Sequence, residues 1–367
     1  MKKKKIIALL ATAVMTISLL AGCGSKDSSA GEPADKKEKV KIGLSTDEGG
    51  LNDKSFNQAA DAGVKKAQKE LKVDYKPIES KQKEDYESNL EALVNDGSSL
   101  TFGVGYQMEQ AMTNVAKKYA DKNFAIVDSD KVNLPNVQCL TFKDQEGSFL
   151  MGVIAGKMTK TNKVGFIGGK DSAPINKFEV GFIAGVKSVN PEAAKGLIGS
   201  KDKPGPMVKY ADSFGDTNKG YELGKSLYGA GCDVVYHAAG GVGIGLFKAA
   251  KELNKSDKKV WAIGVDRDQA VELSEYADII LSSMIKRVDV ATFNATKEVV
   301  DGKFKGGNHI ELGLKQDGVD IAPTSNKNTK KDVLDVVEKY KKAIKEDKIK
   351  VPATRAELVN FTPTEVK

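Results

Sequence analysis

The sequence is poor in the side chains that metal sites and nucleophilic catalysis use most. It has three cysteines and two histidines in 367 residues. Cys139 and Cys232 have neither metal-ligand nor redox spacing, so we expect two buried free thiols. His237 and His309 form no H-E-x-x-H zinc motif, and no G-x-S-x-G nucleophile elbow occurs. We therefore expect no metal, no cofactor and no catalytic residue, and a protein that is not an enzyme.

No apolar run is long enough to span a bilayer. The N-terminal run, Ile6–Ala21, has 16 residues, whereas a transmembrane helix needs roughly 20. It follows Lys2–Lys5 and ends in Leu20-Ala21-Gly22-Cys23, an order typical of a secretory signal. A small-residue turn that ends in Cys is also the lipobox of bacterial lipoproteins. We expect residues 1–22 to be a lipoprotein signal peptide whose cleavage leaves Cys23 lipidated; the alternative is a plain anchor helix.

The chain also lacks a strong excess of one charge. Its net charge is +7, but without Lys2–Lys5 there are 53 basic against 50 acidic residues, which argues against a nucleic-acid partner. Residues 23–39 are polar and contain no apolar cluster, so they are expected to form a flexible tether. The remaining part, about 330 residues, exceeds one ordinary core and suits two lobes.

What the sequence does contain is an internal repeat. A shift of 122 positions pairs Phe56 with Phe178, and a shift of 138 positions pairs Asp128 with Asp266, each together with further matches in the same order. The two shifts differ by one insertion of 16 residues in the second copy. We interpret this as one α/β unit used twice, with the two copies facing each other across a cleft.

Apolar runs alternate with segments of helical periodicity in both copies, which predicts parallel sheets covered by helices on both faces. The fold class is therefore α/β, with two doubly wound, Rossmann-like lobes joined by a hinge. We expect an N-terminal lobe at 40–145, a C-terminal lobe at 146–286, and hinge-crossing and C-terminal helices at 287–367, one of which returns to the first lobe. The expected strands are 40–44, 75–78, 100–104, 124–128, 164–167, 207–210, 234–237, 261–265 and 279–284, and the expected helices are 55–71, 85–95, 106–119, 177–189, 218–228, 244–253, 287–300 and 330–346.

Doubly wound sheets bind ligands beyond the carboxyl ends of their strands, so residues that directly follow strands are candidate site residues. Phe56 opens the helix after the first strand and would stack on a flat ligand; the alternative is a core residue. Asp128 and Asp266 end matched strands, where a carboxylate accepts paired N–H or O–H donors; the alternative is a helix N-cap. Lys286 would donate to a hydroxyl and balance their charge. Asp128 with Asp130 is too thin a basis for a metal-dependent hydrolase.

Further candidates come from the loops and from the repeat. Phe178 is the counterpart of Phe56, and Tyr236 offers another flat face at a strand end unless it belongs to the core. Gly240 and Gly241 lie in a glycine-rich loop that has neither the G-x-G-x-x-G nor the G-K-[ST] pattern of nucleotide loops. Their backbone N–H groups are expected to approach a sugar.

Several of these motifs together resemble the basic membrane protein family of lipoproteins, which contains purine nucleoside receptor A. They are the lipobox, the segment Asp47–Asn57 (DEGGLNDKSFN), the segment Ala239–Gly243 (AGGVG), the segment Gly264–Asp268 (GVDRD) and the segment Ser282–Arg287 (SSMIKR). The resemblance covers roughly residues 40–315. It implies a type I periplasmic-binding fold and the substrate-binding protein of an ABC importer for nucleosides.

The resemblance also implies roles for single residues. Phe56 would stack on the base with Tyr236 opposite, and Asp128 would read the base edge. The ribose would be held by Asp266, Lys286 and the Gly240–Gly241 backbone, and the ligand would touch Asp47 and Asn52 in the signature loop.

The expected partners are a purine nucleoside (guanosine, inosine or adenosine), the ABC permease and ATPase subunits, and the membrane through lipid on Cys23. We expect a monomer on the extracytoplasmic face of the cell membrane. Two alternatives stay open: a receptor for a sugar or signalling ligand on the same fold, and a surface antigen or adhesin without a transport role.

Overall fold

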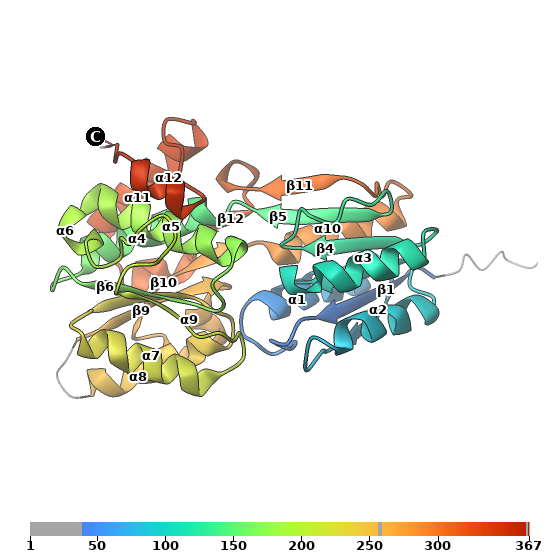
Figure 1. Cartoon of the computed structure of the whole chain (residues 1–367), viewed down its shortest axis with the longest axis horizontal. Helices are drawn as coiled ribbons and strands as arrows, with labels where there is room; N and C mark the ends of the chain where they lie inside the picture. The colour runs from blue at the N-terminus through green and yellow to red at the C-terminus, as the bar shows by residue number, and fades with distance from the viewer. Residues whose placement is uncertain (1–38, 256–258, 365, 367) are drawn as a thin grey trace, which may run out of the picture. The chain divides into compact units, whose positions relative to one another are not determined.

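Two six-stranded sheets occur in residues 39–255, 259–364 and 366, which are the residues that this computed structural model describes. The first sheet has the order β11-β5-β4-β3-β1-β2, and the second has the order β12-β10-β9-β8-β6-β7. We call each sheet with the helices that cover it a lobe (Figure 1). The strands are β1 (Lys41–Thr46), β2 (Asp74–Ile78), β3 (Leu100–Val104), β4 (Asn123–Val127), β5 (Val137–Phe142), β6 (Val164–Gly168), β7 (Val208–Tyr210), β8 (Val234–Ala238), β9 (Trp261–Asp266), β10 (Ile280–Lys286), β11 (His309–Leu312) and β12 (Val319–Ile321).

The two sheets have the same architecture, as the internal repeat predicts. Strands β1 to β5 and then β11 occupy the same positions in the first sheet as β6 to β10 and then β12 in the second. All pairings in the first sheet are parallel, and in the second only β12 pairs antiparallel, with β10. The predicted doubly wound α/β class is confirmed. The carboxyl ends of all six strands of the first sheet and of five strands of the second therefore each lie along one edge.

Helices cover both faces of each sheet. They are α1 (Phe56–Glu70), α2 (Asp85–Asn95), α3 (Glu109–Lys118), α4 (Asp144–Met158), α5 (Ala173–Val189), α6 (Pro191–Ala194), α7 (Thr217–Gly229), α8 (Val242–Asn254), α9 (Gln269–Glu272), α10 (Val288–Val300), α11 (Lys331–Lys345) and α12 (Arg355–Asn360). In the second lobe, α4 and α5 pack together on one face while α7 and α8 pack together on the other (Figure 1).

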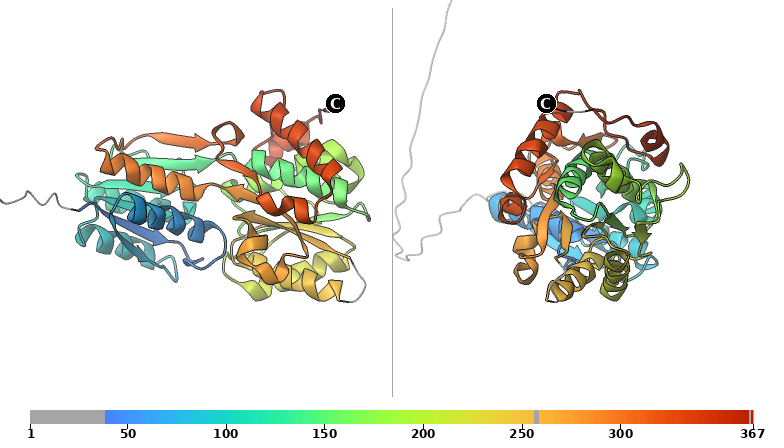
Figure 2. Two further views of the ribbon diagram at one scale, coloured as in Figure 1. Left: turned by 180° about the vertical axis from the view of Figure 1, so that it is seen from behind. Right: turned by 90° about the vertical axis from the view of Figure 1, so that its left-hand side faces the viewer.

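A pair of repeated glycines explains how two of these helix pairs pack. A Cβ on Gly63 of α1 would lie 2.1 Å from the carbonyl oxygen of Asp289 in α10, and a Cβ on Gly185 of α5 would lie 2.0 Å from that of Phe149 in α4. Both distances are impossible for a real side chain, so each glycine permits a close approach of two helices. Figure 2 shows α10 beside α1, although the two helices are far apart in the sequence.

The chain crosses between the lobes three times. It leaves the first lobe between β5 and α4, returns between β10 and α10, and leaves again between β11 and β12. The helix predicted at 287–300 does return to the first lobe, where α10 packs on α1. Three connections limit relative motion of the lobes to bending at the crossings.

Two central elements were not predicted from the sequence. Strand β5 and helix α4 follow the matched residues of the first copy, in a stretch for which we expected no particular strand or helix. The predicted signal peptide, Cys23 and all of the tether before Lys39 lie outside the described residues. Within the described ranges, no helix has both the length and the apolar character needed to cross a bilayer. Cys139 and Cys232 are buried free thiols, as predicted.

Candidate functional site

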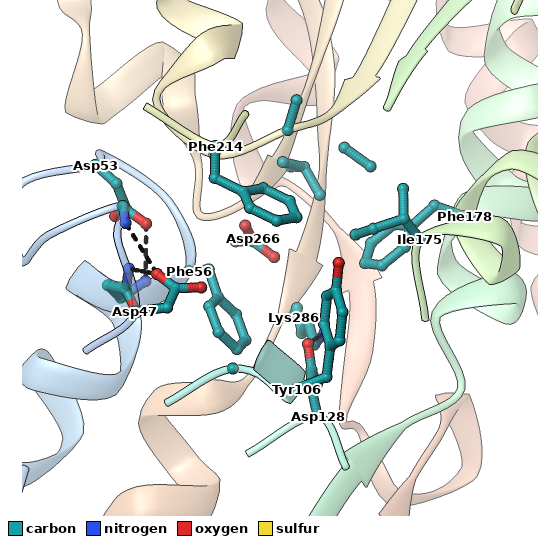
Figure 3. Close-up of a pocket in the computed structure, with 17 residues that line it drawn as sticks. Asp47, Asp53, Phe56, Tyr106, Asp128, Ile175, Phe178, Phe214, Asp266 and Lys286 are labelled. Atoms are coloured by element: carbon teal, nitrogen blue, oxygen red, sulfur yellow. Dashed lines mark hydrogen bonds and ion pairs between the residues drawn. The ribbon is translucent and has the colours of Figure 1, made fainter. Parts of the chain in front are cut away.

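A cavity lies at the edge where the strand ends of both lobes meet. It holds about 520 Å³ of space not filled by protein atoms, open solvent at its mouth included. Figure 3 shows the rings of Phe56, Tyr106, Phe178 and Phe214 around this space. The residues that line it are Asp47, Gly49, Asp53, Phe56, Asn57, Gly105, Tyr106, Asp128, Ile175, Phe178, Phe214, Ala238, Ala239, Gly240, Val265, Asp266 and Lys286.

The loop after β1 positions Phe56 through two aspartates. Asp53 accepts hydrogen bonds from the backbone N–H groups of Ser55 (2.9 Å), Asn57 (2.9 Å) and Gln58 (3.1 Å), and so caps the first turn of α1. Asp47 accepts from the Gly49 N–H at 3.0 Å and from the Asn57 side-chain amide at 2.8 Å. This network holds the loop against the helix and leaves the Phe56 ring at the cavity wall.

The matched aspartates Asp128 and Asp266 share an unusual backbone conformation. Their φ angles are +65° and +66°, in the left-handed region that residues other than glycine rarely adopt. Asp128 directly follows β4 and Asp266 is the last residue of β9, the equivalent strand of the second lobe. Strain of this kind persists where the surrounding structure imposes it and clusters at ligand sites. In both copies this backbone conformation directs the aspartate carboxylate into the cavity at the end of the strand.

Lys286 lies between these carboxylates. Its side chain is 1% exposed, and its Nζ is 2.5 Å from Asp128 Oδ2 and 3.1 Å from Asp144 Oδ1. The rings of Phe56, Phe142 and Phe178 lie 5.0–5.1 Å from the same ammonium, within the range of cation–π attraction.

Burial and charge together decide the ionisation of this cluster. Burial alone would lower the pKa of Lys286, but the charges of Asp128, Asp144 and Asp266 outweigh it and raise that pKa. Burial raises the pKa of Asp266 to about 7, against the opposing pull of Lys286 and Ser55. Burial likewise raises the pKa of Asp53 to about 6 and raises that of Asp47. Lys286 is thus held as the cation of a carboxylate-rich site.

Direct contacts between the lobes close the cavity. The Ser55 hydroxyl of the first lobe donates to Asp266 of the second, and Lys286 of the second lobe pairs with Asp128 of the first. At the rim, Lys170 Nζ lies 2.6 Å from Glu48 Oε1 and 2.7 Å from Gln107 Oε1, both in the first lobe. The structure therefore has its lobes in contact around the cavity.

Seven of the residues predicted to bind ligand line the cavity together: Asp47, Phe56, Asp128, Phe178, Gly240, Asp266 and Lys286. Three others do not. Asn52 is exposed, and its side chain accepts from Lys54 Nζ at 3.0 Å. Gly241 is the N-cap of α8 and is not among the residues that line the cavity.

Tyr236 belongs to the core rather than to the cavity. It is fully buried, and its ring centre lies 5.6 Å from that of Phe166 and 5.2 Å from that of Phe182. Its hydroxyl, which needs a partner when buried, lies 3.0 Å from Ser148 Oγ. The expectation that Tyr236 faces the ligand is wrong because β8 is covered on both faces, so this side chain points under helices α4 and α5.

Phe214 and Tyr106 are cavity residues that the sequence reasoning missed. They face each other from opposite lobes, with ring centres 6.5 Å apart and planes at 79°. Tyr106 lies two residues after β3, and Phe214 lies four residues after β7. The rule that residues following strands line the site, applied to every strand, would have found both.

Two doubly wound α/β lobes with a cavity at their facing strand ends form the type I periplasmic-binding fold. A solved ABC transporter solute-binding protein from Aeropyrum pernix has the same fold, with a TM-score of 0.76 and 26% identity over 88% of this chain and 96% of that one. The family model described as "ABC transporter substrate-binding protein PnrA-like" matches residues 39–355. The chain belongs to this family and is a substrate-binding protein of an ABC transporter.

Relatives of known sequence match this chain along nearly its whole length. The CD4+ T-cell-stimulating antigen of Listeria innocua is 40% identical, over 96% of this chain and 99% of that protein. The ABC transporter nucleoside-binding protein BmpA of Lactococcus lactis is 39% identical with the same coverage.

Proposed function

We propose that this protein is the lipid-anchored binding component of an ABC importer, and that it binds purine nucleosides between its lobes. One observation carries the proposal: the cavity combines aromatic rings from both lobes with carboxylates at both sets of strand ends. Rings suit the flat faces of a base, where stacking is worth about 1–3 kcal/mol. Carboxylates suit the paired donors of a base edge and the hydroxyls of a ribose. The Lactococcus relative is named as a nucleoside-binding protein.

The roles of single residues follow from their positions. Phe56 from the first lobe and Phe214 from the second are the proposed stacking partners, which gives Phe214 the role expected for Tyr236. Asp266, Lys286 and the Gly240 backbone are the proposed ribose contacts, since they lie together on the second lobe. Asp128 is assigned to the base edge.

Two unpartnered oxygens suggest which purine is preferred. Asp128 Oδ1 and Asn57 Oδ1 are buried and have no hydrogen-bond partner among the described residues, and both residues line the cavity. The Asn57 amide is oriented because its nitrogen donates to Asp47. Both free atoms are acceptors, so the ligand must supply donors. Guanosine presents adjacent ring and exocyclic N–H groups, and we propose that it binds more tightly than adenosine.

The test is calorimetric titration and thermal shift of the mature domain, freed of co-purified ligand by unfolding and refolding. Guanosine, inosine, adenosine, guanine, ribose and glucose form the panel. A nucleoside at 100 times its Kd should add about 2.7 kcal/mol of apparent stability. Phe56→Ala should weaken binding, whereas Asn52→Ala, in the same loop but outside the cavity, should not. Binding of sugars alone, or of nothing in the panel, would refute the nucleoside proposal.

The lipid anchor at Cys23, the extracytoplasmic location, the monomeric state and delivery to permease and ATPase subunits belong to the same proposal. They are supported by the lipobox and by membership of an ABC transporter family. Cys23→Ala should release the protein from the membrane fraction and abolish incorporation of labelled palmitate. Retention of the variant in membranes would contradict lipid anchoring.

A further inference from the structure

One buried carboxylate of the Lys286 cluster does not line the cavity. Asp144 is 3% exposed and is the first residue of α4, directly after the first crossing between the lobes. Within the described ranges, its side chain makes one ion pair, with Lys286, where Oδ1 and Nζ are 3.1 Å apart. Its position at the start of α4, where a helix N-terminus favours a negative charge, and the attraction of Lys177 also act on the charge of Asp144.

Burying Asp144 is unfavourable for folding. Burial raises the pKa of Asp144 to about 7 and the charge of Asp128 adds to this, whereas the charges of Lys286 and Lys177 oppose it. The attraction of Lys286 and Lys177 does not offset the cost of leaving water, since the pKa of Asp144 stays raised, so the presence of this carboxylate points to a role other than stability. That role must concern Lys286, the group that it contacts.

The two ion-pair partners of Lys286, Asp144 and Asp128, lie in different lobes, and this difference indicates what Asp144 does. Lys286 ends β10, and Asp144 begins α4, which packs against β10 in the second lobe. Asp128 belongs to the first lobe. When the lobes separate to admit a ligand, the contact with Asp128 must break, whereas the contact with Asp144 lies within the second lobe and can persist.

We propose that Asp144 is a positioning residue that holds the Lys286 ammonium at the boundary between the lobes before they close. This inference rests on the proposed function. Without the Asp144 charge, the long lysine side chain of the open form is free to turn into water, and closure must order it again. With the charge in place, the ammonium is already aimed at Asp128 and at the ligand, which lowers the cost of binding.

The test is a double-mutant cycle on nucleoside affinity. Asp144→Asn keeps the size of the side chain and removes its charge, and Lys286→Met removes the ammonium that it positions. Asp144→Asn should weaken the binding of guanosine, inosine or adenosine about tenfold, a typical coupling for residues in contact. In the Lys286→Met background, the same change should alter affinity less than twofold. Weak variants are measured by thermal shift with ligand up to millimolar concentration.

A matched control separates positioning from folding. Asp233 is also buried in the second lobe, where it accepts hydrogen bonds from Thr159, Lys160 and Thr161 at the other end of α4. Asp233→Asn should lower the melting temperature without changing affinity. If Asp144→Asn does not fold, Asp144→Ser takes its place.

The outcomes are distinct. Equal losses of affinity in the wild-type and Lys286→Met backgrounds would show a merely structural role and overturn the inference. Unchanged affinity of Asp144→Asn in the wild-type background would overturn it as well. Failure of the wild-type protein to bind any of the three nucleosides would instead reject the proposed function, and this inference with it.

Discussion

The stability of the ligand-free protein should depend on the ionisation of Asp266. Burial raises the pKa of this carboxyl to about 7 in the folded protein, whereas in an unfolded chain it is about 3.9. Between these two values the folded state keeps a proton that the unfolded state has released. Folding stability therefore falls as pH rises from about 4 to about 7, by up to about 1.4 kcal/mol per pH unit, and is constant above that range.

Asp266→Asn isolates this contribution. The amide is neutral at every pH and keeps an oxygen that can accept from Ser55, so the variant lacks the pH-dependent loss. From pH 5 to pH 7 its stability should improve relative to wild type by up to about 3 kcal/mol. With an unfolding entropy of about 2.1 cal/mol/K per residue over roughly 330 residues, this corresponds to about 4 °C in melting temperature. Lys286 stays protonated over this range and adds no pH dependence of its own.

Circular dichroism melts at pH 5, 6, 7 and 8 measure the difference directly. Asp53 and Asp144 also have raised pKa values, but they are present in both proteins and largely cancel in the difference. Asn52→Ala serves as a control, with a difference from wild type that is independent of pH. A melting-temperature difference between wild type and Asp266→Asn that stays constant from pH 5 to pH 7 would refute a buried, proton-retaining Asp266.

Three further predictions test other parts of the molecule. Phe214→Ala should weaken nucleoside binding by about 1–3 kcal/mol, as measured by calorimetry; unchanged affinity would remove Phe214 from the site. Arg355→Met leaves Glu179, which is 1% exposed and lies 2.6 Å from Arg355, without a cation, although the Tyr210 hydroxyl still donates to it. The change should cost about 3 kcal/mol of stability in urea unfolding; no loss would mean that α12 is not anchored by this pair. Lys170→Ala removes the rim contact with Glu48 and should speed ligand release in stopped-flow displacement, and an unaltered rate would show that the rim does not control opening.

The lobes and much of the site could be predicted because they depend on local pattern. Short apolar runs followed by helical periodicity specify strands and helices, and parallel order then places the strand ends at one edge. Phe56, Asp128, Asp266 and Lys286 were predicted on this basis, and the structure brings all four into one cavity.

Where a segment is buried on every side, the pattern disappears. Helix α4 is apolar around nearly its whole circumference, since it lies beneath α5, α11 and the second sheet, so no helical period marks it. Strand β8 is buried along its whole length, and alternation cannot show which of its side chains faces the cavity. For that reason the predicted position of Tyr236, in the cavity, was wrong.

The internal repeat explains why the site needs both lobes. The two copies contribute equivalent carboxylates, Asp128 and Asp266, in the same left-handed conformation. They differ at the next strand: β5 ends in Phe142, whereas the equivalent strand β10 ends in Lys286. One copy thus supplies the only cation that lines the cavity among the described residues, for carboxylates of both copies. An unpaired buried charge is costly, and Asp128 is paired with Lys286 only when the two lobes are in contact. The difference between two otherwise equivalent strand ends, Phe142 and Lys286, therefore favours the closed arrangement of the lobes.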